Sequence, residues 1–223
     1  MEGGQPDGFV ASLTSEEIDD LLARGVRRQF RRGAFIFTEG DSSDHVVFVL
    51  AGRVKVSSFT AEGKEVVLAV RGPGELLGEF SALDGEPRMA SVSAVEAVEV
   101  LVLPADRFEL FLQDHARLAV MLLRSVIRKL REAERQRVEF GAYDAAGRVA
   151  RRLVELVTRF GLETEQGVQI TLALSQEELA GWTGSSREAV SKALRTFRDR
   201  GWIETKRRQI VVIDPQALRE RAE

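Results

Sequence analysis

The chain has 223 residues and a net charge of −3, with 44% hydrophobic and 30% charged residues, as expected for a globular protein of one large or two small domains. Cysteine is absent, which excludes disulfides, zinc–thiolate sites, thiol catalysis and a cysteine-ligated iron–sulfur cluster. No apolar run approaches the ~20 residues of a membrane helix, and residues 1–7 lack the basic and apolar regions of a secretory signal, so we expect a cytoplasmic protein with no membrane segment.

The N-terminal region predicts a tail followed by a short helix. Residues 1–10 are typical of a loose tail. Thr14 and Glu17 have the spacing of a capping box, in which the hydroxyl accepts from a free backbone N–H and the carboxylate reaches back to the cap. We therefore expect a helix from this point to about Arg24.

Residues 26–103 have the pattern of an antiparallel β-domain. Short runs rich in β-branched and aromatic residues alternate with glycines, which is typical of strands joined by tight turns in a small barrel or sandwich. The strand-like runs are residues 34–37, 46–50, 54–56, 66–70 and 98–103.

Residues 106–140 predict helix, with a bend or interruption near the beginning, because they contain no glycine or proline and are rich in helix formers. Apolar residues recur at alternating spacings of three and four, as in a coiled-coil seam. A second copy of the chain is the simplest cover for this seam, and packing against its own β-domain is the alternative. The interface residues that we predict are Leu123, Val126, Leu130 and Ala133.

The end of the long helix and the start of the next one are also predicted. Gly141 is expected to break the helix, and Asp144 is a suitable N-cap for the helix that follows. The last 80 or so residues then read as helix, strand, helix, helix and hairpin, which indicates a separate small domain.

A helix-turn-helix pattern lies within this last domain. Ser175 with Glu178 and Ser185 with Glu188 have capping-box spacing, so two helices are expected to begin ten residues apart. Thr183 and Gly184 form the predicted turn between them. Helix-turn-helix packing also occurs in proteins that do not bind DNA, so this pattern needs independent support.

Charge supplies that support. Between Arg187 and Arg208 there are eight basic and three acidic residues, a segment charge of +5 in an otherwise acidic chain. The alternative to a DNA-binding surface is a charged helix face that is simply exposed to solvent. The N-terminal part of a recognition helix meets base edges in the major groove, and the basic tip of the following hairpin would contact phosphates as a wing. The predicted DNA contacts are Ser186, Arg187, Glu188, Ser191, Lys192, Lys206, Arg207 and Arg208.

Residues 78–90 form a second candidate site. Backbone N–H groups beside glycines, together with one arginine, can hold a phosphate, and a nearby carboxylate can accept hydrogen bonds from sugar hydroxyls. The simpler alternative is that Glu79 and Arg88 pair across a turn. The candidate effector contacts are Gly78, Glu79, Phe80, Ser81, Arg88 and Met89.

Nearly the whole chain resembles the cyclic-AMP receptor protein/FNR family of bacterial transcription regulators. Residues 35–41 and 52–56 resemble its β-roll, residues 78–88 its phosphate-binding cassette, and residues 185–192 its recognition helix. The resemblance implies an α+β fold: a cyclic-nucleotide-binding β-roll (residues 1–105), a long dimerisation helix (106–140) and a C-terminal winged helix-turn-helix domain (141–223). It also implies a homodimer that binds palindromic double-stranded DNA and acts on RNA polymerase, and that is not an enzyme.

The resemblance places Arg88 at the cyclic phosphate and Glu79 at the ribose hydroxyl. Three departures concern the effector: Met89 replaces a small hydroxyl residue, and Ala133 and Glu134 stand where the family offers hydroxyl or amide groups to adenine. Cyclic AMP, another nucleotide, or no effector at all in a constitutive DNA-binding protein therefore remain open.

Metal-based sensing is not expected. The family's iron–sulfur oxygen sensors need cysteines, which the chain lacks, and His45 and His115 are the only histidines that could ligate haem.

One departure concerns the DNA contacts. Lys192 stands where the family often has arginine, so the compact ammonium of lysine replaces a guanidinium that could donate two parallel hydrogen bonds to one base.

Overall fold

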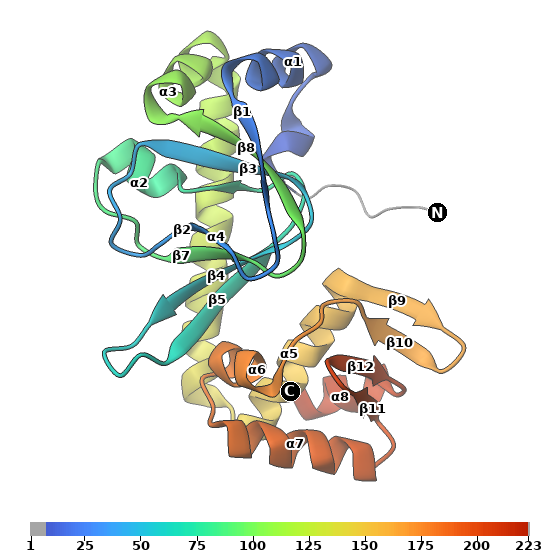
Figure 1. Ribbon diagram of the computed structural model, residues 1–223. Coiled ribbons are helices and arrows are strands. Elements are labelled where there is room, and N and C mark those ends of the chain that lie inside the picture. Colours follow the sequence, from blue (N-terminus) through green and yellow to red (C-terminus); the bar gives the residue numbers. More distant parts are fainter. Residues whose placement is uncertain (1–7, 223) are drawn as a thin grey trace. The chain divides into compact units, whose positions relative to one another are not determined.

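The computed structural model describes residues 8–222, which form two compact units (Figure 1). One unit contains residues up to 58 and residues 68–132, and the other contains residues 59–67 and those from 133 onward. The helices are η1 (Phe9–Ser12), α1 (Ser15–Arg24), α2 (Glu79–Asp84), α3 (Ala105–Asp114), α4 (Ala116–Ala142), α5 (Ala145–Phe160), α6 (Gln176–Thr183), α7 (Arg187–Asp199) and α8 (Pro215–Ala222). The strands are β1 (Val26–Phe30), β2 (Phe35–Phe37), β3 (His45–Ala51), β4 (Val54–Phe59), β5 (Glu65–Arg71), β6 (Leu76–Leu77), β7 (Ser91–Ala94), β8 (Val98–Pro104), β9 (Gly161–Thr164), β10 (Gly167–Ile170), β11 (Ile203–Lys206) and β12 (Gln209–Val212).

The N-terminal unit is built on two four-stranded sheets. Their strand orders are β1-β8-β3-β6 and β2-β7-β4-β5. The strand pairs resolved in register, such as β3 with β8 and β4 with β7, are antiparallel. The predicted small antiparallel β-domain is therefore confirmed.

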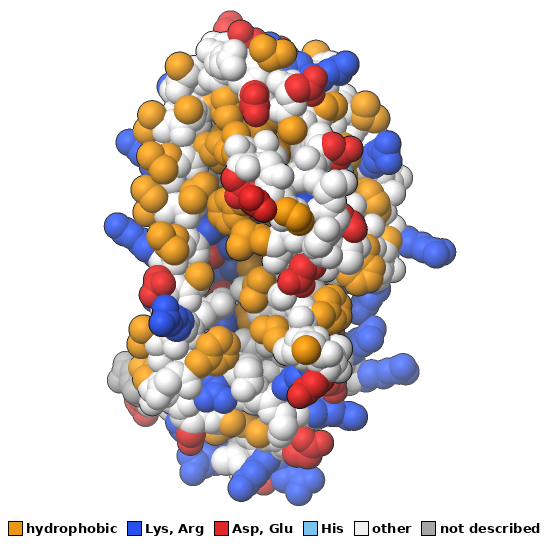
Figure 2. Space-filling view, turned by 90° about the vertical axis from the view of Figure 1, so that its left-hand side faces the viewer, with side chains coloured by type: hydrophobic (Ala, Val, Ile, Leu, Met, Phe, Trp, Pro, Cys, Tyr) orange, Lys and Arg blue, Asp and Glu red, His pale blue; other side chains and the backbone are white. Residues whose placement is uncertain are grey.

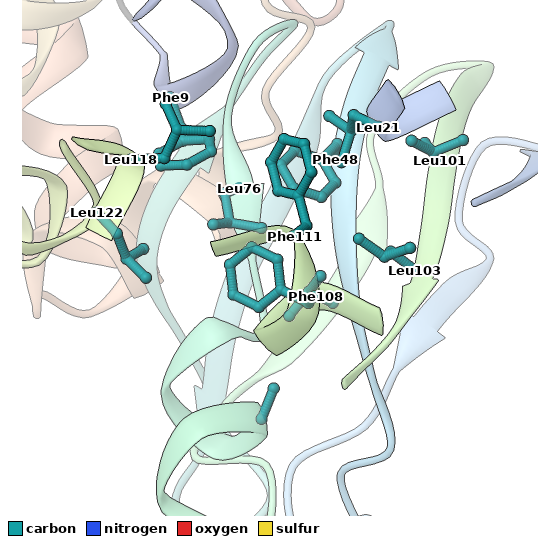
Figure 3. Close-up of a cluster of buried hydrophobic side chains, with 12 residues drawn as sticks. Phe9, Leu21, Phe48, Leu76, Leu101, Leu103, Phe108, Phe111, Leu118 and Leu122 are labelled. Carbon is teal, nitrogen blue, oxygen red and sulfur yellow. The ribbon is translucent and has the colours of Figure 1, made fainter. Parts of the chain in front are cut away.

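The core of this unit joins the strands to the flanking helices (Figure 3). Phe48 on β3 contacts Phe108 on α3 edge-to-face, with ring centroids 6.1 Å apart. Phe9 also packs against Phe48 at 6.1 Å and is almost fully buried. The prediction of a loose tail was thus wrong from Phe9 onward, because one aromatic ring anchors η1 in the core. Residues 1–7 of the predicted tail lie outside the described residues.

The predicted interruption of the long helical segment occurs at His115, between α3 and α4. Its backbone angles (φ −123°, ψ 63°) end α3, and α4 begins at the next residue. A His115 ring nitrogen lies 2.9 Å from an Asp20 carboxylate oxygen, and the ring contacts Phe111 at 4.9 Å. His115 therefore fastens α1 to the α3–α4 junction.

The other end of α4 differs from the sequence prediction. The helix continues through Gly141 and ends at Ala142, so the prediction that Gly141 breaks it was wrong. Glycine inside a helix costs only about 1 kcal/mol relative to alanine, which neighbouring turns offset. The predicted N-cap is confirmed: Asp144 accepts a hydrogen bond from the backbone N–H of Gly147 at 2.7 Å.

The C-terminal unit is a winged helix-turn-helix domain, as predicted. Helices α5, α6 and α7 surround a core that includes Leu153, Trp182 and Phe197, and the four-stranded sheet has the order β11-β12-β10-β9. The sequence predicted one strand between the first two helices of this domain, where the structure has the β9–β10 hairpin, and it did not predict α8. Helix α8 closes the core with Leu218, and its Arg221 forms an ion pair with Asp144 at 2.6 Å.

Within residues 8–222, none of the helices is both long enough and apolar enough to cross a membrane.

Candidate DNA-binding and effector sites

The two helices of the helix-turn-helix begin at local hydrogen-bond caps. Ser175 and Glu178 form the predicted capping box on α6. On α7 the cap is Ser186, whose hydroxyl oxygen accepts from the Ala189 N–H at 3.2 Å, and not Ser185 as the sequence spacing predicted. Ser185 is buried and its hydroxyl donates to the Thr183 carbonyl, so it belongs to the turn.

The turn between α6 and α7 requires Gly184. Its φ of 56° is left-handed, a region that glycine adopts without steric cost. A Cβ atom there would also lie only 2.6 Å from the ring of Phe140. Arg148 on α5 fastens the same turn, because its Nε donates to the Thr183 carbonyl at 2.7 Å. Gly184 and Arg148 thus fix the angle at which α7 leaves the turn.

The exposed face of α7 borders a groove of about 450 Å³. Four of the eight predicted DNA contacts line it: Arg187, Glu188, Ser191 and Lys192. Two further lining residues, Gln176 and Arg195, were missed by the sequence prediction. The helical repeat could have found Arg195, since it follows Ser191 by four residues and Glu188 by seven.

The charged groups on this face are available to a ligand. Within residues 8–222, neither the Arg187 guanidinium nor the Lys192 ammonium has a hydrogen-bond partner, and both side chains are exposed. Hydrogen bonds from its own backbone N–H and from Ser186 lower the pKa of the Glu188 carboxyl. Glu188 is therefore ionised at neutral pH and can act only as an acceptor.

The wing is the β11–β12 hairpin, and three of the other four predicted DNA contacts lie at its tip; the fourth, Ser186, is the N-cap of α7. Lys206 pairs with Gln209 across the two strands, and Arg207 and Arg208 form the connecting turn. All three cations are exposed. Arg208 has a φ of 57°, a left-handed conformation that costs a non-glycine residue roughly 1–2 kcal/mol. An arginine at such a strained position points to a role for its side chain.

The cassette at residues 78–90 is organised by Gly78 and Arg88. Gly78 has a φ of 79° and precedes α2, and a Cβ atom there would lie 2.4 Å from an Arg88 nitrogen. Only glycine therefore allows the arginine to pack here. Arg88 donates to the carbonyls of Gly78, at 3.0 Å, and His45, at 2.6 Å.

Arg88 is buried but not fully satisfied. Its side chain is 2% exposed and stacks on Phe37, with the guanidinium carbon 4.3 Å from the ring centroid. In the part of the chain that the structure describes, its Nε atom has no hydrogen-bond partner. Burial lowers the pKa of the guanidinium, although arginine remains charged at neutral pH. A buried cation with a spare donor suits an anionic ligand, so these residues fit the phosphate of a nucleotide.

Glu79 is engaged by α4 and not by Arg88. Its carboxylate lies 2.7 Å from the Lys129 ammonium, which also donates to the Leu76 carbonyl at 2.8 Å. The simpler alternative, an ion pair between Glu79 and Arg88, is therefore wrong. A second ion pair joins the buried Arg71 to Glu132 on α4 at 2.6 Å. Two ion pairs thus connect α4 to the β-domain.

The other predicted effector contacts differ in accessibility. Phe80 is partly buried beside Lys129, and the buried Ser81 hydroxyl donates to the Pro87 carbonyl at 3.1 Å. Met89 is 65% exposed. Ser81 therefore shapes the cassette from within, while Met89 lies on its outer surface.

One face of α4 presents apolar side chains to solvent. Of the predicted interface residues, Leu123 and Leu130 are 58% and 60% exposed, Ala133 is exposed, and Val126 is partly buried. Val120 and Ile127 are also exposed and continue the stripe at spacings of three and four. Figure 2 shows hydrophobic side chains in a column along the edge of the molecule on which α4 lies. The exposed stripe is thus rotated from the predicted seam toward Val120 and Ile127.

Comparison with known proteins identifies the family. Residues 27–115 match the cyclic nucleotide-binding domain, and residues 147–221 match the Crp-like helix-turn-helix domain. The chain is 33% identical over 193 residues to the CRP-like cAMP-activated global transcriptional regulator of Mycobacterium tuberculosis, and the match covers 86% of each chain. It is 34% identical to the cyclic AMP receptor protein of Thermus thermophilus, and this match covers 85% of this chain and 84% of the relative. The fold matches the c-di-GMP-responsive regulator CLP of Xanthomonas campestris with a TM-score of 0.82 at 23% identity, over 89% of this chain and 99% of that one. The chain therefore belongs to the CRP/FNR family of DNA-binding transcription regulators, whose members are not enzymes.

Proposed function

We propose that the protein is a cytoplasmic, homodimeric, sequence-specific DNA-binding transcription regulator controlled by a nucleotide effector. In this proposal residues 1–105 bind the effector, residues 106–140 join the two copies and residues 141–223 bind DNA. The observation that carries the proposal is the groove beside α7, which is lined by an ionised Glu188 and by the exposed Arg187 and Lys192 side chains, neither of which has a hydrogen-bond partner among residues 8–222.

These residues match the chemistry of base edges in a major groove. Arg187 can donate two parallel hydrogen bonds to O6 and N7 of guanine, and Glu188 can accept from N4 of cytosine. Ser191 and Lys192 contribute single donors to the same groove, while the Ser186 cap holds the first turn of α7 in place. The wing adds contacts to phosphates, which raise affinity without reading sequence.

Substituting Arg207 in the wing isolates this phosphate contribution. We expect Arg207→Ala to weaken binding to specific and non-specific duplexes alike and to reduce the slope of log affinity against log salt by about one, because one counterion-releasing contact is lost. Fluorescence anisotropy at several salt concentrations measures both quantities. A loss confined to one sequence would contradict the assignment of Arg207 to phosphate.

The exposed apolar stripe on α4 supports homodimerisation, in which a second copy of the chain packs against these residues. Two such helices packed along Val120, Leu123, Ile127 and Leu130 would bury residues that are otherwise in water. A two-fold axis along this seam would present two α7 helices to a palindromic site with half-sites about 34 Å apart. RNA polymerase is the expected protein partner of the DNA-bound dimer.

The cassette supports an anionic effector. Arg88 would hold its phosphate, with Gly78, Phe80, Ser81 and Met89 around it, and Glu79 would accept from a ribose hydroxyl. Cyclic AMP is the first nucleotide to test, since the relatives from Mycobacterium tuberculosis and Thermus thermophilus are both named for it. An effector acts only by binding the DNA-competent arrangement of the dimer more tightly than other arrangements.

Removing Arg88 tests this assignment. We expect Arg88→Ala to abolish both the heat of nucleotide binding and any effect of the nucleotide on DNA affinity, because the buried cation is lost. Isothermal titration calorimetry with cyclic AMP, cyclic GMP and cyclic dinucleotides measures the binding, and thermal unfolding confirms that the variant is folded. A fully retained nucleotide response in a folded variant would show that the effector lies elsewhere.

A second candidate is a regulator that needs no effector. The ion pairs of Lys129 with Glu79 and of Arg71 with Glu132 already fasten α4 to the β-domain, and two carbonyls already accept hydrogen bonds from the terminal nitrogens of Arg88. Ala133 and Glu134 offer no neutral hydrogen-bonding group to a base. The same calorimetry discriminates, because Arg88-dependent binding of any of these nucleotides would reject this candidate.

Selection of bound sequences from random duplexes, with and without the candidate nucleotides, tests the proposed function as a whole. We expect a palindrome whose half-site contains the guanine and cytosine contacts of Arg187 and Glu188. Recovery of no palindrome under any condition would overturn the proposal.

A further inference from the structure

Arg195 occupies the centre of the DNA-facing arc of α7. It follows Glu188 by seven residues, and at about 100° per residue the two directions differ by only about 20°. By the same rotation of about 100° per residue around the helix axis, the direction of Arg187 lies to one side of that of Arg195, and the direction of Lys192 lies to the other. Arg195 also lines the same groove as these residues.

The side chain of Arg195 is not used by the fold. It is exposed, and within residues 8–222 it has no hydrogen-bond or ion-pair partner. The next two arginines along the helix differ, because Arg198 donates to the Thr205 hydroxyl at 2.7 Å and Arg200 stacks on Trp202 with the guanidinium carbon 4.9 Å from its ring. Of these three cations, Arg195 is the one left for a ligand in the groove.

We propose that Arg195 reads a base pair beyond those read by Arg187, Glu188 and Lys192. The proposal rests on the DNA-binding function above and extends its specificity. Seven residues of α-helix rise about 10.5 Å, which is about three base-pair steps of 3.4 Å along a helix lying in the groove. Its central position on the arc directs Arg195 to the groove floor, where the guanidinium can fork onto guanine O6 and N7.

The experiment compares selected sequences for the unmodified dimer and for Arg195→Ala, Arg195→Lys and Glu188→Gln, with Arg219→Ala on the exposed face of α8 as a matched control. Glu188→Gln identifies the base pair that Glu188 reads. We expect a guanine preference about three base pairs from it, reduced about tenfold in Arg195→Ala, partly kept in Arg195→Lys and unchanged in Arg219→Ala. Alanine is the best helix former, so the variant keeps α7 intact.

Two results would overturn the inference while leaving the proposed function standing. One is an Arg195→Ala motif identical to that of the unmodified protein with undiminished affinity. The other is an identical motif with affinity lowered equally on all sequences and a smaller salt slope, which would make Arg195 a phosphate contact. If the unmodified protein selects no sequence at all, the proposed function itself fails, so the two failures are distinguishable.

Discussion

Replacing Leu130 with glutamate is expected to convert the dimer to monomers and to lower affinity for a palindromic site by about 10²-fold or more. The two copies of Leu130 face each other across the proposed seam, so the substitution would place two carboxylates in an apolar contact. The monomer would then lose the effective concentration with which one bound half-site favours the second. Analytical ultracentrifugation measures the association, and anisotropy on a duplex with both half-sites measures the affinity.

Leu110→Glu is the matched control, since Leu110 is 52% exposed against 60% for Leu130 and belongs to α3 and not to the α4 stripe. Both leucines are accessible in the single chain, so neither substitution should lower the thermal stability of the isolated protomer by much. A Leu130→Glu protein that remains dimeric, or a control that dissociates equally, would contradict the assignment of the α4 stripe to the dimer.

Arg187→Ala is expected to lower affinity for the selected site by roughly 5- to 150-fold, equivalent to about 1–3 kcal/mol, and to relax the choice of base at one position in each half-site. The guanidinium has no hydrogen-bond partner within the described chain, so its removal leaves no buried group unsatisfied and the fold should be unaffected. Quantitative binding to duplexes carrying each of the four base pairs at that position measures the effect.

The contrast with Arg207→Ala makes this result specific. Both substitutions remove one positive charge from the same domain, but only the α7 substitution should change which base is preferred. If Arg187→Ala weakened binding equally to all four duplexes, the α7 arginine would be a phosphate contact and the orientation of α7 in the groove would need revision.

Local patterns in the sequence predicted the elements that carry the site. The capping residues Thr14 and Ser175, and the N-cap Asp144, were identified correctly because each acts through hydrogen bonds within three residues. The predicted capping box of Ser185 with Glu188 was wrong. Ser185 and Ser186 are adjacent serines, so local spacing cannot distinguish them, and the fold decides which of the two the turn buries. Burial of Ser185 beneath Arg148 leaves Ser186 as the cap.

Partners that are distant in the sequence could not be predicted. The ion pair of Glu79 with Lys129 joins residues 50 positions apart, and no local spacing indicates it. The same applies to Phe9, whose burial depends on Phe48, and to Arg88, whose acceptors include the His45 carbonyl. The exposed α4 stripe differs from the predicted seam because Val126 is partly buried whereas Val120 and Ile127 are exposed, which the heptad spacing alone does not show.

The ion pair between Glu79 and Lys129 bears most directly on the proposed regulation. In the structure Lys129 binds the carboxylate that would hold a ribose hydroxyl, so nucleotide binding must compete with an existing ion pair. A ligand that breaks this contact and rebuilds it through its own hydroxyl would change how α4 is held, and α4 carries the proposed dimer seam. Under the proposed function, this ion pair would link the effector to the dimer seam and so to the spacing of the two α7 helices.

That spacing is tested most directly by moving the half-sites apart. The selected palindrome is compared with versions carrying 5 or 10 additional base pairs at its centre, using the same protein concentration and salt. Because the proposed seam would hold the two α7 helices about one DNA turn apart, we expect both insertions to reduce binding to that of an isolated half-site. Equal affinity for all three duplexes would mean that the two helices act independently, and would contradict the proposed dimer.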